Sequence, residues 1–104
     1  MKNKNIPLAK PLIGRNEKRA VLKVLNSGNL AQGPVVAEFE SNFSKFVGDR
    51  DCVAVNSGTS GLVTAVMSLG IGQGDEVIVP SFTFAASANS IALCGAKPVF
   101  IDID

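Results

Sequence analysis

The second half of the sequence alternates between short apolar runs typical of strands and patterns typical of helices, and this alternation limits the possible folds. The strand-like runs cover residues 52–55, 75–79 and 99–103. Helical patterns over residues 62–69 and 85–93 separate them, with short connections. Antiparallel neighbours would not need helical crossovers, so the pattern predicts an α/β architecture with a parallel sheet.

The first half of the sequence predicts an extended arm followed by two amphipathic helices. Two prolines within residues 6–12 disfavour a helix there. Residues 15–26 have helical spacing and end at a Ser-Gly-Asn stop, and Pro34 can begin a second helix that reaches a stop at Gly48. One face of the second helix and almost all of the helix over 62–69 are apolar, so we expect both to be buried; the face comprises Val35, Val36, Phe39, Phe43, Phe46 and Val47.

The charge balance and the missing histidine exclude several classes of function. The 104 residues include ten Lys plus Arg, nine Asp plus Glu and no His, for a formal net charge of +1. Without clustered positive charge we expect no nucleic-acid or membrane partner. Without His there is no self-contained Ser-His-Asp or Cys-His catalytic set and no His-based zinc site, and we expect no metal.

The remaining general features predict a soluble, cytoplasmic protein. No segment approaches the ~18 continuous apolar residues of a membrane span. Cys52 and Cys94 lie far apart in apolar surroundings, which favours reduced, structural thiols. Residues 97–104 alternate like a strand and then stop, so we expect a truncated chain or an isolated segment.

A phosphate-binding turn is one interpretation of residues 56–61, Asn-Ser-Gly-Thr-Ser-Gly, which follow the first predicted strand. Gly58 would allow a tight turn, and Ser57 or Thr59 would cap the next helix, whose free N–H groups suit a phosphate. The alternative is structural, because any turn from a strand to a helix favours Gly and a capping Ser or Thr. The segment lacks the patterns G-x-x-x-x-G-K-[ST], G-x-G-x-x-G and G-x-S-x-G.

Two aromatic residues follow the second predicted strand, within residues 80–84. Either Phe82 or Phe84 is a candidate to stack on a planar ligand. Burial of both rings is the alternative, and the turn considered by itself favours it.

In order and spacing, these segments resemble the DegT/DnrJ/EryC1/StrS family of fold-type I aminotransferases, which depend on pyridoxal 5′-phosphate (PLP). The resemblance covers nearly the whole chain and rests on residues 27–34, 56–62, 72–78, 80–84 and 95–102 together with the proline-rich arm. It implies a partial three-layer αβα large domain in a single incomplete domain, with the arm at about 1–14 and the N-terminal part of the PLP-binding domain at about 15–104.

The resemblance also implies a cofactor site. Backbone groups around Gly58, Thr59 and Ser60 would hold the cofactor phosphate, with the Thr59 and Ser60 hydroxyls as further donors. Phe84 matches the position whose ring stacks over the pyridine, where many relatives have Trp or Tyr.

No catalytic residue is assigned, because the Schiff-base lysine, the carboxylate that pairs with the pyridinium nitrogen and the small second domain lie beyond residue 104 in relatives. Lysines on polar helix faces, and Lys97 in a predicted turn, are expected to be solvated. Asp102 and Asp104 are expected to be structural residues at a strand end.

The implied function of the full-length protein is transfer of an amino group, usually from glutamate, to a keto-sugar nucleotide, in the biosynthesis of amino sugars, cell-surface polysaccharides or antibiotic sugars. The 104-residue chain itself is expected to be inactive. The alternatives are a PLP-dependent sugar 3-dehydratase, in which His replaces the lysine, and a non-catalytic regulatory or vestigial fragment.

The family resemblance further implies a homodimer with active sites at the subunit boundary. The arm over 6–12 and the loop over 29–33 are candidate contacts, with packing inside the chain as the alternative. In the family's sheet order, residues 52–55 would lie at one edge without a neighbour, and the strands at 76–79 and 99–103 would pair near the other edge.

Overall fold

The computed structural model describes residue 7 and residues 9–103. It divides into two compact units, residues 1–52 and 53–104, which we describe separately. The predicted arm at about 1–14 falls partly outside the described residues, at positions 1–6 and 8, as does Asp104. The predicted division at about residue 15 stays a prediction.

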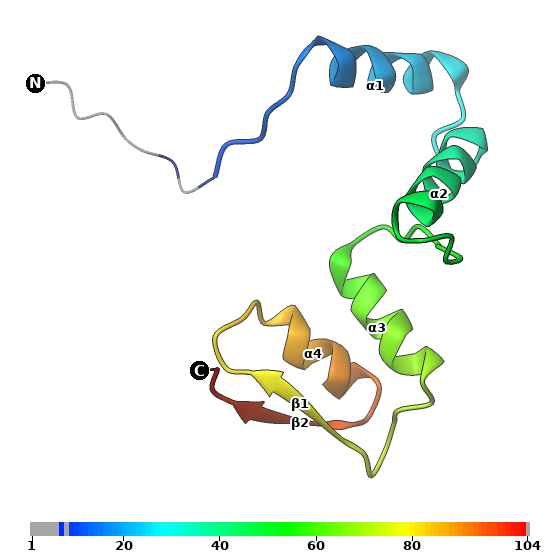
Figure 1. Ribbon diagram of the computed structural model, residues 1–104. Coiled ribbons are helices and arrows are strands. Elements are labelled where there is room, and N and C mark those ends of the chain that lie inside the picture. Colours follow the sequence, from blue (N-terminus) through cyan, green and yellow to red (C-terminus); the bar gives the residue numbers. More distant parts are fainter. Residues whose placement is uncertain (1–6, 8, 104) are drawn as a thin grey trace, which may run out of the picture. The chain divides into compact units, whose positions relative to one another are not determined.

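The first unit contains the two predicted helices, α1 (Arg15–Ser27) and α2 (Pro34–Phe46) (Figure 1). At the start of α1, the Gly14 N–H donates a hydrogen bond of 2.7 Å to Glu17 Oε2, which is half of a capping box. The helix ends at Gly28, whose φ of 72° is the left-handed conformation that favours glycine. Pro34 occupies the first turn of α2, as predicted.

The prediction that the phenylalanines of α2 form a core is wrong for this unit. Neither α1 nor α2 contains a buried residue, and Phe39 and Phe46 are 57% and 84% exposed. The ring of Phe43 lies 5.9 Å from that of Phe39 and 6.2 Å from that of Phe46, so the three rings form a stripe. The stripe stays exposed because the described part of the unit has no sheet or third helix to cover it.

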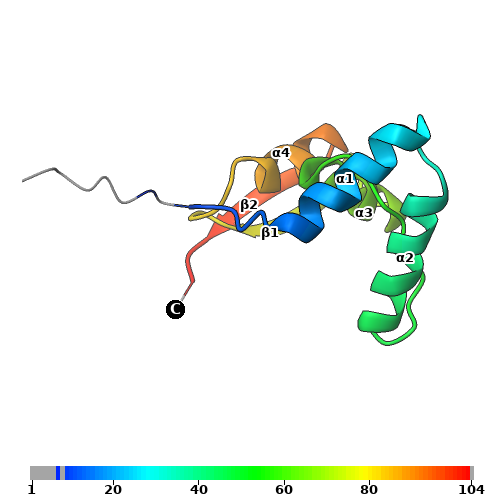
Figure 2. The same ribbon diagram turned by 90° about the horizontal axis from the view of Figure 1, so that it is seen from above.

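The second unit is a strand–helix–strand arrangement preceded by one helix. Its elements are α3 (Gly58–Ser68), β1 (Glu76–Pro80), α4 (Ala86–Leu93) and β2 (Lys97–Ile101). The two strands are parallel, with Ile78 opposite Val99, and α4 packs against both of them (Figures 1 and 2). The predictions of a parallel sheet and of pairing between these strands are therefore confirmed.

The core of the second unit is small. Its buried apolar residues are Val79, Ile91 and Ala96. Ser90 is also buried, and its hydroxyl donates a 2.9 Å hydrogen bond to the Ser87 carbonyl. This bond offsets the desolvation of the Ser90 hydroxyl.

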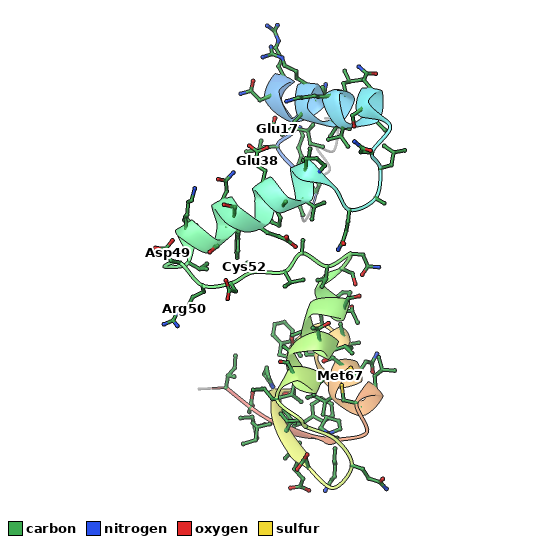
Figure 3. The ribbon with its side chains drawn as sticks, turned by 90° about the vertical axis from the view of Figure 1, so that its right-hand side faces the viewer. Glu17, Glu38, Asp49, Arg50, Cys52 and Met67 are labelled. Carbon is green, nitrogen blue, oxygen red and sulfur yellow. The ribbon has the colours of Figure 1, made fainter. Side chains whose placement is uncertain are left out.

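The predicted burial of the apolar helix after residue 61 is wrong for this unit. Although α3 packs on α4, no residue of α3 is buried. Met67, labelled in Figure 3, is 65% exposed, and Leu69 just after the helix is 75% exposed. A single neighbouring helix covers only one side of an apolar helix.

The predicted strand over 52–55 is not formed. In the part of the chain that the structure describes, the sheet consists of β1 and β2. Figure 3 shows the segment around Cys52 as an extended connection, and Val53 is 79% exposed. Apolar β-rich composition makes a run suitable for a strand, but a strand forms only beside another strand.

Candidate functional site

The start of α3 carries the turn for which the sequence leaves two interpretations, a phosphate site or a structural helix cap. Ser57 precedes the helix in an extended conformation, and its Oγ accepts the Ser60 N–H at 3.1 Å. Its carbonyl accepts the Gly61 N–H at 3.1 Å. Ser57, rather than the other predicted candidate Thr59, is therefore the cap.

A chain of side-chain hydrogen bonds supports this cap. Ser60 Oγ donates to Asn56 Oδ1 at 2.6 Å, and the Ser57 and Ser60 Oγ atoms are 3.0 Å apart. A serine hydroxyl has one proton, and that of Ser60 is given to Asn56. Ser57 must then be the donor to Ser60.

Two backbone amide groups remain as free donors at the start of α3. Among the described residues, neither the Gly58 N–H nor the Thr59 N–H has a hydrogen-bond partner, and the Thr59 hydroxyl also has none. A Cβ built on Gly58 would meet nothing within 4 Å, and the φ of Gly58 is not positive. The fold therefore does not require glycine at position 58, although glycine allows the turn there.

The chemistry of this donor set fits a phosphate. It combines two amide N–H groups, one hydroxyl and the positive end of an 11-residue helix, with open space beside Gly58. Ser60 differs from its neighbours, because both its N–H and its hydroxyl are bonded within the turn.

The loop between β1 and α4 presents two aromatic rings. Phe82 is 90% exposed and Phe84 is 83% exposed, so the predicted alternative of two buried rings is wrong. The backbone around them is held by bonds from Ser81 N–H to the Ile101 carbonyl and from Ser87 N–H to the Phe84 carbonyl, both 2.9 Å. A fixed backbone with solvated rings suits stacking on a ligand, and exposure by itself does not choose between the two rings.

Both predicted site segments belong to the second unit. They lie at the N-terminal ends of α3 and α4, which pack against each other and run in the same general direction in Figure 1. The prediction from sequence missed Asn56, although its place directly before Ser-Gly-Thr-Ser was the available signal.

The lysines and aspartates of the described chain offer no further reacting group. The prediction that Lys97 lies in a turn is wrong. Lys97 begins β2 opposite Glu76, and its Nζ lies 2.7 Å from Glu76 Oε1. Hydrogen bonding and charge from that carboxylate raise the pKa of Lys97, which keeps its amine protonated. Asp102 Oδ1 accepts the Ile103 N–H at 2.9 Å, in keeping with the predicted structural role.

The described part of the chain offers neither a metal site nor a membrane-spanning helix. No group of three or more His, Cys, Asp and Glu residues is arranged to hold a metal ion there. None of its helices combines the length and apolar character needed to cross a membrane. Cys52 and Cys94 are free thiols, in agreement with the prediction.

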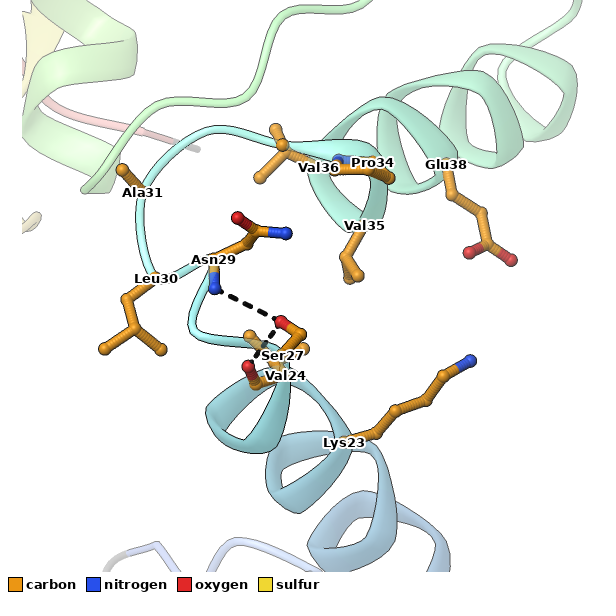
Figure 4. A pocket seen from close by; sticks show the side chains of 11 residues that line it. Lys23, Val24, Ser27, Asn29, Leu30, Ala31, Pro34, Val35, Val36 and Glu38 are labelled. Carbon is orange, nitrogen blue, oxygen red and sulfur yellow. Dashed lines mark hydrogen bonds between the residues drawn. The ribbon is translucent and has the colours of Figure 1, made fainter.

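The first unit has a groove of about 390 Å³ between the end of α1 and the start of α2 (Figure 4). The loop beside it is held by Ser27, whose hydroxyl donates to the Val24 carbonyl at 2.7 Å and accepts the Asn29 N–H at 3.2 Å. Leu30 in this loop is 67% exposed. The predicted role of the loop in a dimer contact stays a prediction.

Comparison with known proteins gives consistent matches. The family model for the DegT/DnrJ/EryC1/StrS aminotransferase family matches residues 11–104. The spore coat polysaccharide biosynthesis protein SpsC of Bacillus subtilis (strain 168) is 48% identical over 103 residues, which are 99% of this chain and 26% of that protein.

Two solved structures extend this similarity to the backbone. The putative sugar aminotransferase Spr1654 of Streptococcus pneumoniae, in its PMP-form, is 39% identical with a TM-score of 0.88 over 96% of this chain and 25% of that one. The E. coli GDP-4-keto-6-deoxy-D-mannose-3-dehydratase with bound hydrated PLP is 29% identical with a TM-score of 0.86 over 96% of this chain and 27% of that one. The predicted α/β fold class is confirmed, and the chain spans about a quarter of the length of these relatives.

Proposed function

Because the chain belongs to the DegT/DnrJ/EryC1/StrS aminotransferase family, we propose that it supplies the N-terminal part of an enzyme that transfers an amino group from glutamate to a keto-sugar nucleotide. The observation that carries this proposal is the open set of donors at the start of α3, with a solvated aromatic ring on the same unit. The names of the B. subtilis and S. pneumoniae relatives support a sugar substrate and a role in polysaccharide biosynthesis.

The cofactor of the proposed enzyme is PLP, which supplies the electron sink for amino transfer when bound. The amides of Gly58 and Thr59 and the Thr59 hydroxyl hold its phosphate, and Ser60 belongs to the same turn. The ring of Phe84 stacks over the pyridine and lacks the polar atom that Trp or Tyr would add. Residues outside this chain supply the reacting lysine, so the 104-residue chain is inactive.

A sugar 3-dehydratase is the second candidate, and the match to the E. coli dehydratase favours it. The residue at the lysine position decides between the two, because a dehydratase has His there. A non-catalytic fragment is the third candidate. A reading frame that continues to that lysine supports an enzyme, whereas a stop shortly after Asp104 supports a fragment.

The proposed enzyme is a cytoplasmic homodimer, with the arm over 6–12 and the loop over 29–33 near the subunit boundary. The exposed Leu12, at 94%, and Leu30, at 67%, are consistent with contacts outside the described units. A full-length protein that remains monomeric by light scattering while fully active would contradict the dimer.

The proposal is tested in a hybrid protein in which residues 1–104 replace the matching segment of the B. subtilis relative, 26% of its length. We expect the hybrid to fold, to show bound-cofactor absorbance with PLP and to aminate a member of a panel of keto-sugar nucleotides. A hybrid that lacks both absorbance and amination refutes the proposal. A hybrid that does not fold also counts against it, because a segment of this fold must support the rest of the protein.

The assignment of Phe84 is tested by a pair of variants in the same hybrid. Loss of an aromatic stacking contact costs about 0.5–1.5 kcal/mol, so Phe84→Ala is expected to weaken PLP binding by roughly 2- to 13-fold. Phe82→Ala is the matched control, since Phe82 is equally solvated in the same loop. Equal losses for both variants, or a larger loss for Phe82→Ala, would overturn the assignment.

A further inference from the structure

The hydrogen bonds at the start of α3 distinguish residues whose donors are unpaired from residues whose donors are bonded within the turn. The Ser60 N–H is given to Ser57 Oγ at 3.1 Å, and the Ser60 hydroxyl is given to Asn56 Oδ1 at 2.6 Å. Ser60 therefore has no proton left for a ligand. The available donors in the first turn are those of Gly58 and Thr59.

We propose that Asn56 is a positioning residue of the phosphate turn, which acts by accepting the Ser60 hydroxyl proton. This inference rests on the proposed function, since it concerns how the turn holds the cofactor phosphate. The amide oxygen of Asn56 can only accept, so it sets the direction of the whole network: Ser60 donates to Asn56, and Ser57 donates to Ser60.

The consequence of this direction is a fixed cap. Ser57 Oγ gives its proton to Ser60 Oγ and keeps its lone pairs toward the Ser60 N–H. The cap in turn fixes the backbone of the first turn, where the Gly58 and Thr59 N–H groups start. Ser60 thus acts on the phosphate through the backbone and not as a hydroxyl donor.

The test compares single and double variants in the hybrid protein, with Kd values for PLP and for pyridoxal, which lacks the phosphate. Asn56→Ala and Ser60→Ala break the same neutral hydrogen bond, so each is expected to weaken PLP binding by about 2- to 10-fold. The double variant is expected to lose no more than either single variant. Pyridoxal binding is expected to stay unchanged in all three.

Three further variants serve as references. Ser60→Thr keeps the hydroxyl and is expected to retain the affinity for PLP. Thr59→Ala removes a direct donor to a charged group and is expected to cost roughly 10-fold or more. Ser68→Ala, at the other end of α3, removes a hydroxyl bonded to the Ala65 carbonyl at 2.8 Å and is expected to have no effect.

The ³¹P chemical shift of the bound PLP gives a readout that a loss of stability would not move. We expect Asn56→Ala and Ser60→Ala to change it in the same way. A large loss for Ser60→Ala with none for Asn56→Ala would overturn the inference, because Ser60 would then be a direct donor. Failure of the unsubstituted hybrid to bind PLP would instead refute the proposed function.

Discussion

Replacement of Ile91 by Ala is the sharpest test of the packing in the second unit. Ile91 is 4% exposed and lies on α4, against the sheet that contains Val79, the other large buried side chain. Truncation of a buried Ile to Ala typically costs 2–5 kcal/mol. Each 1.4 kcal/mol corresponds to a factor of ten, so the opening equilibrium of the unit should shift by roughly 30- to 4,000-fold.

Amide hydrogen exchange in the 104-residue chain measures this shift at two positions. The Ser81 and Lys97 N–H groups donate at 2.9 Å to the Ile101 and Asp75 carbonyls, respectively, and exchange only when this part of the unit opens. Sodium sulfate is added because it strengthens burial and raises the protection of the unsubstituted chain. We expect Ile91→Ala to remove most or all of the protection at both amides.

The matched control is Leu93→Ala on the same helix. Leu93 is 71% exposed, so its truncation to Ala should change the protection by less than about threefold. Both substitutions introduce Ala into α4, so their effects on helix propensity are similar and nearly cancel when the two variants are compared. Equal protection in the two variants would refute the reasoning, since Ile91 would then contribute no more than a solvated side chain.

Three further predictions concern the isolated chain, the Glu17 cap and the Lys97–Glu76 ion pair. Without sulfate, residues 1–104 alone should be marginally stable, prone to aggregate through exposed strand edges and unable to hold PLP tightly; a cooperative, protected monomer with micromolar affinity in a cofactor titration would contradict this. Backbone N–H groups of Glu17 itself and of Gly14 donate hydrogen bonds that lower the pKa of the Glu17 carboxyl. The start of α1 should therefore fray as the pH falls below about 4.5, the ordinary value. NMR Cα shifts of residues 15–18 should report this fraying, and Glu17→Gln should abolish its pH dependence. The ion pair with Glu76 raises the pKa of Lys97, so it stabilises the β1–β2 pair at pH values below the ordinary 10.5, and this stabilisation is lost as the pH rises through the raised value. The midpoint of thermal unfolding, followed by circular dichroism, should fall in that range. An unchanged pH dependence in Lys97→Met would count against the ion pair.

Local signals made the helices of the first unit predictable from sequence. Gly28 and Pro34 act within one turn of the chain, and the observed ends of α1 and α2 lie close to the predicted ones. The strand over 52–55 was not predictable in this way, because its formation depends on a neighbour that apolar composition cannot supply. The same limit applies to Phe39, where helical spacing predicts an apolar face but not what covers it.

The start of the helix at the candidate site was predictable from sequence, but the hydrogen bonds around it were not. The Ser-Gly-Thr-Ser pattern marks the beginning of a helix with free N–H groups, and α3 begins there. Whether Ser57 or Thr59 caps the helix depends on side-chain rotamers, and in the structure Ser57 is the cap. The 2.6 Å hydrogen bond from the Ser60 hydroxyl to Asn56 Oδ1 depends on side-chain geometry and could not be predicted from sequence spacing.

The open space beside Gly58 separates the demands of folding from those of binding at one position. The backbone there is not left-handed, and a methyl group would touch nothing within 4 Å. Alanine would therefore fit and would restrict the unfolded chain, a gain of about 0.4–1 kcal/mol in stability. In the proposed phosphate site, the same methyl group would stand beside the Gly58 N–H, so a glycine that the fold does not require would leave that volume for the cofactor phosphate.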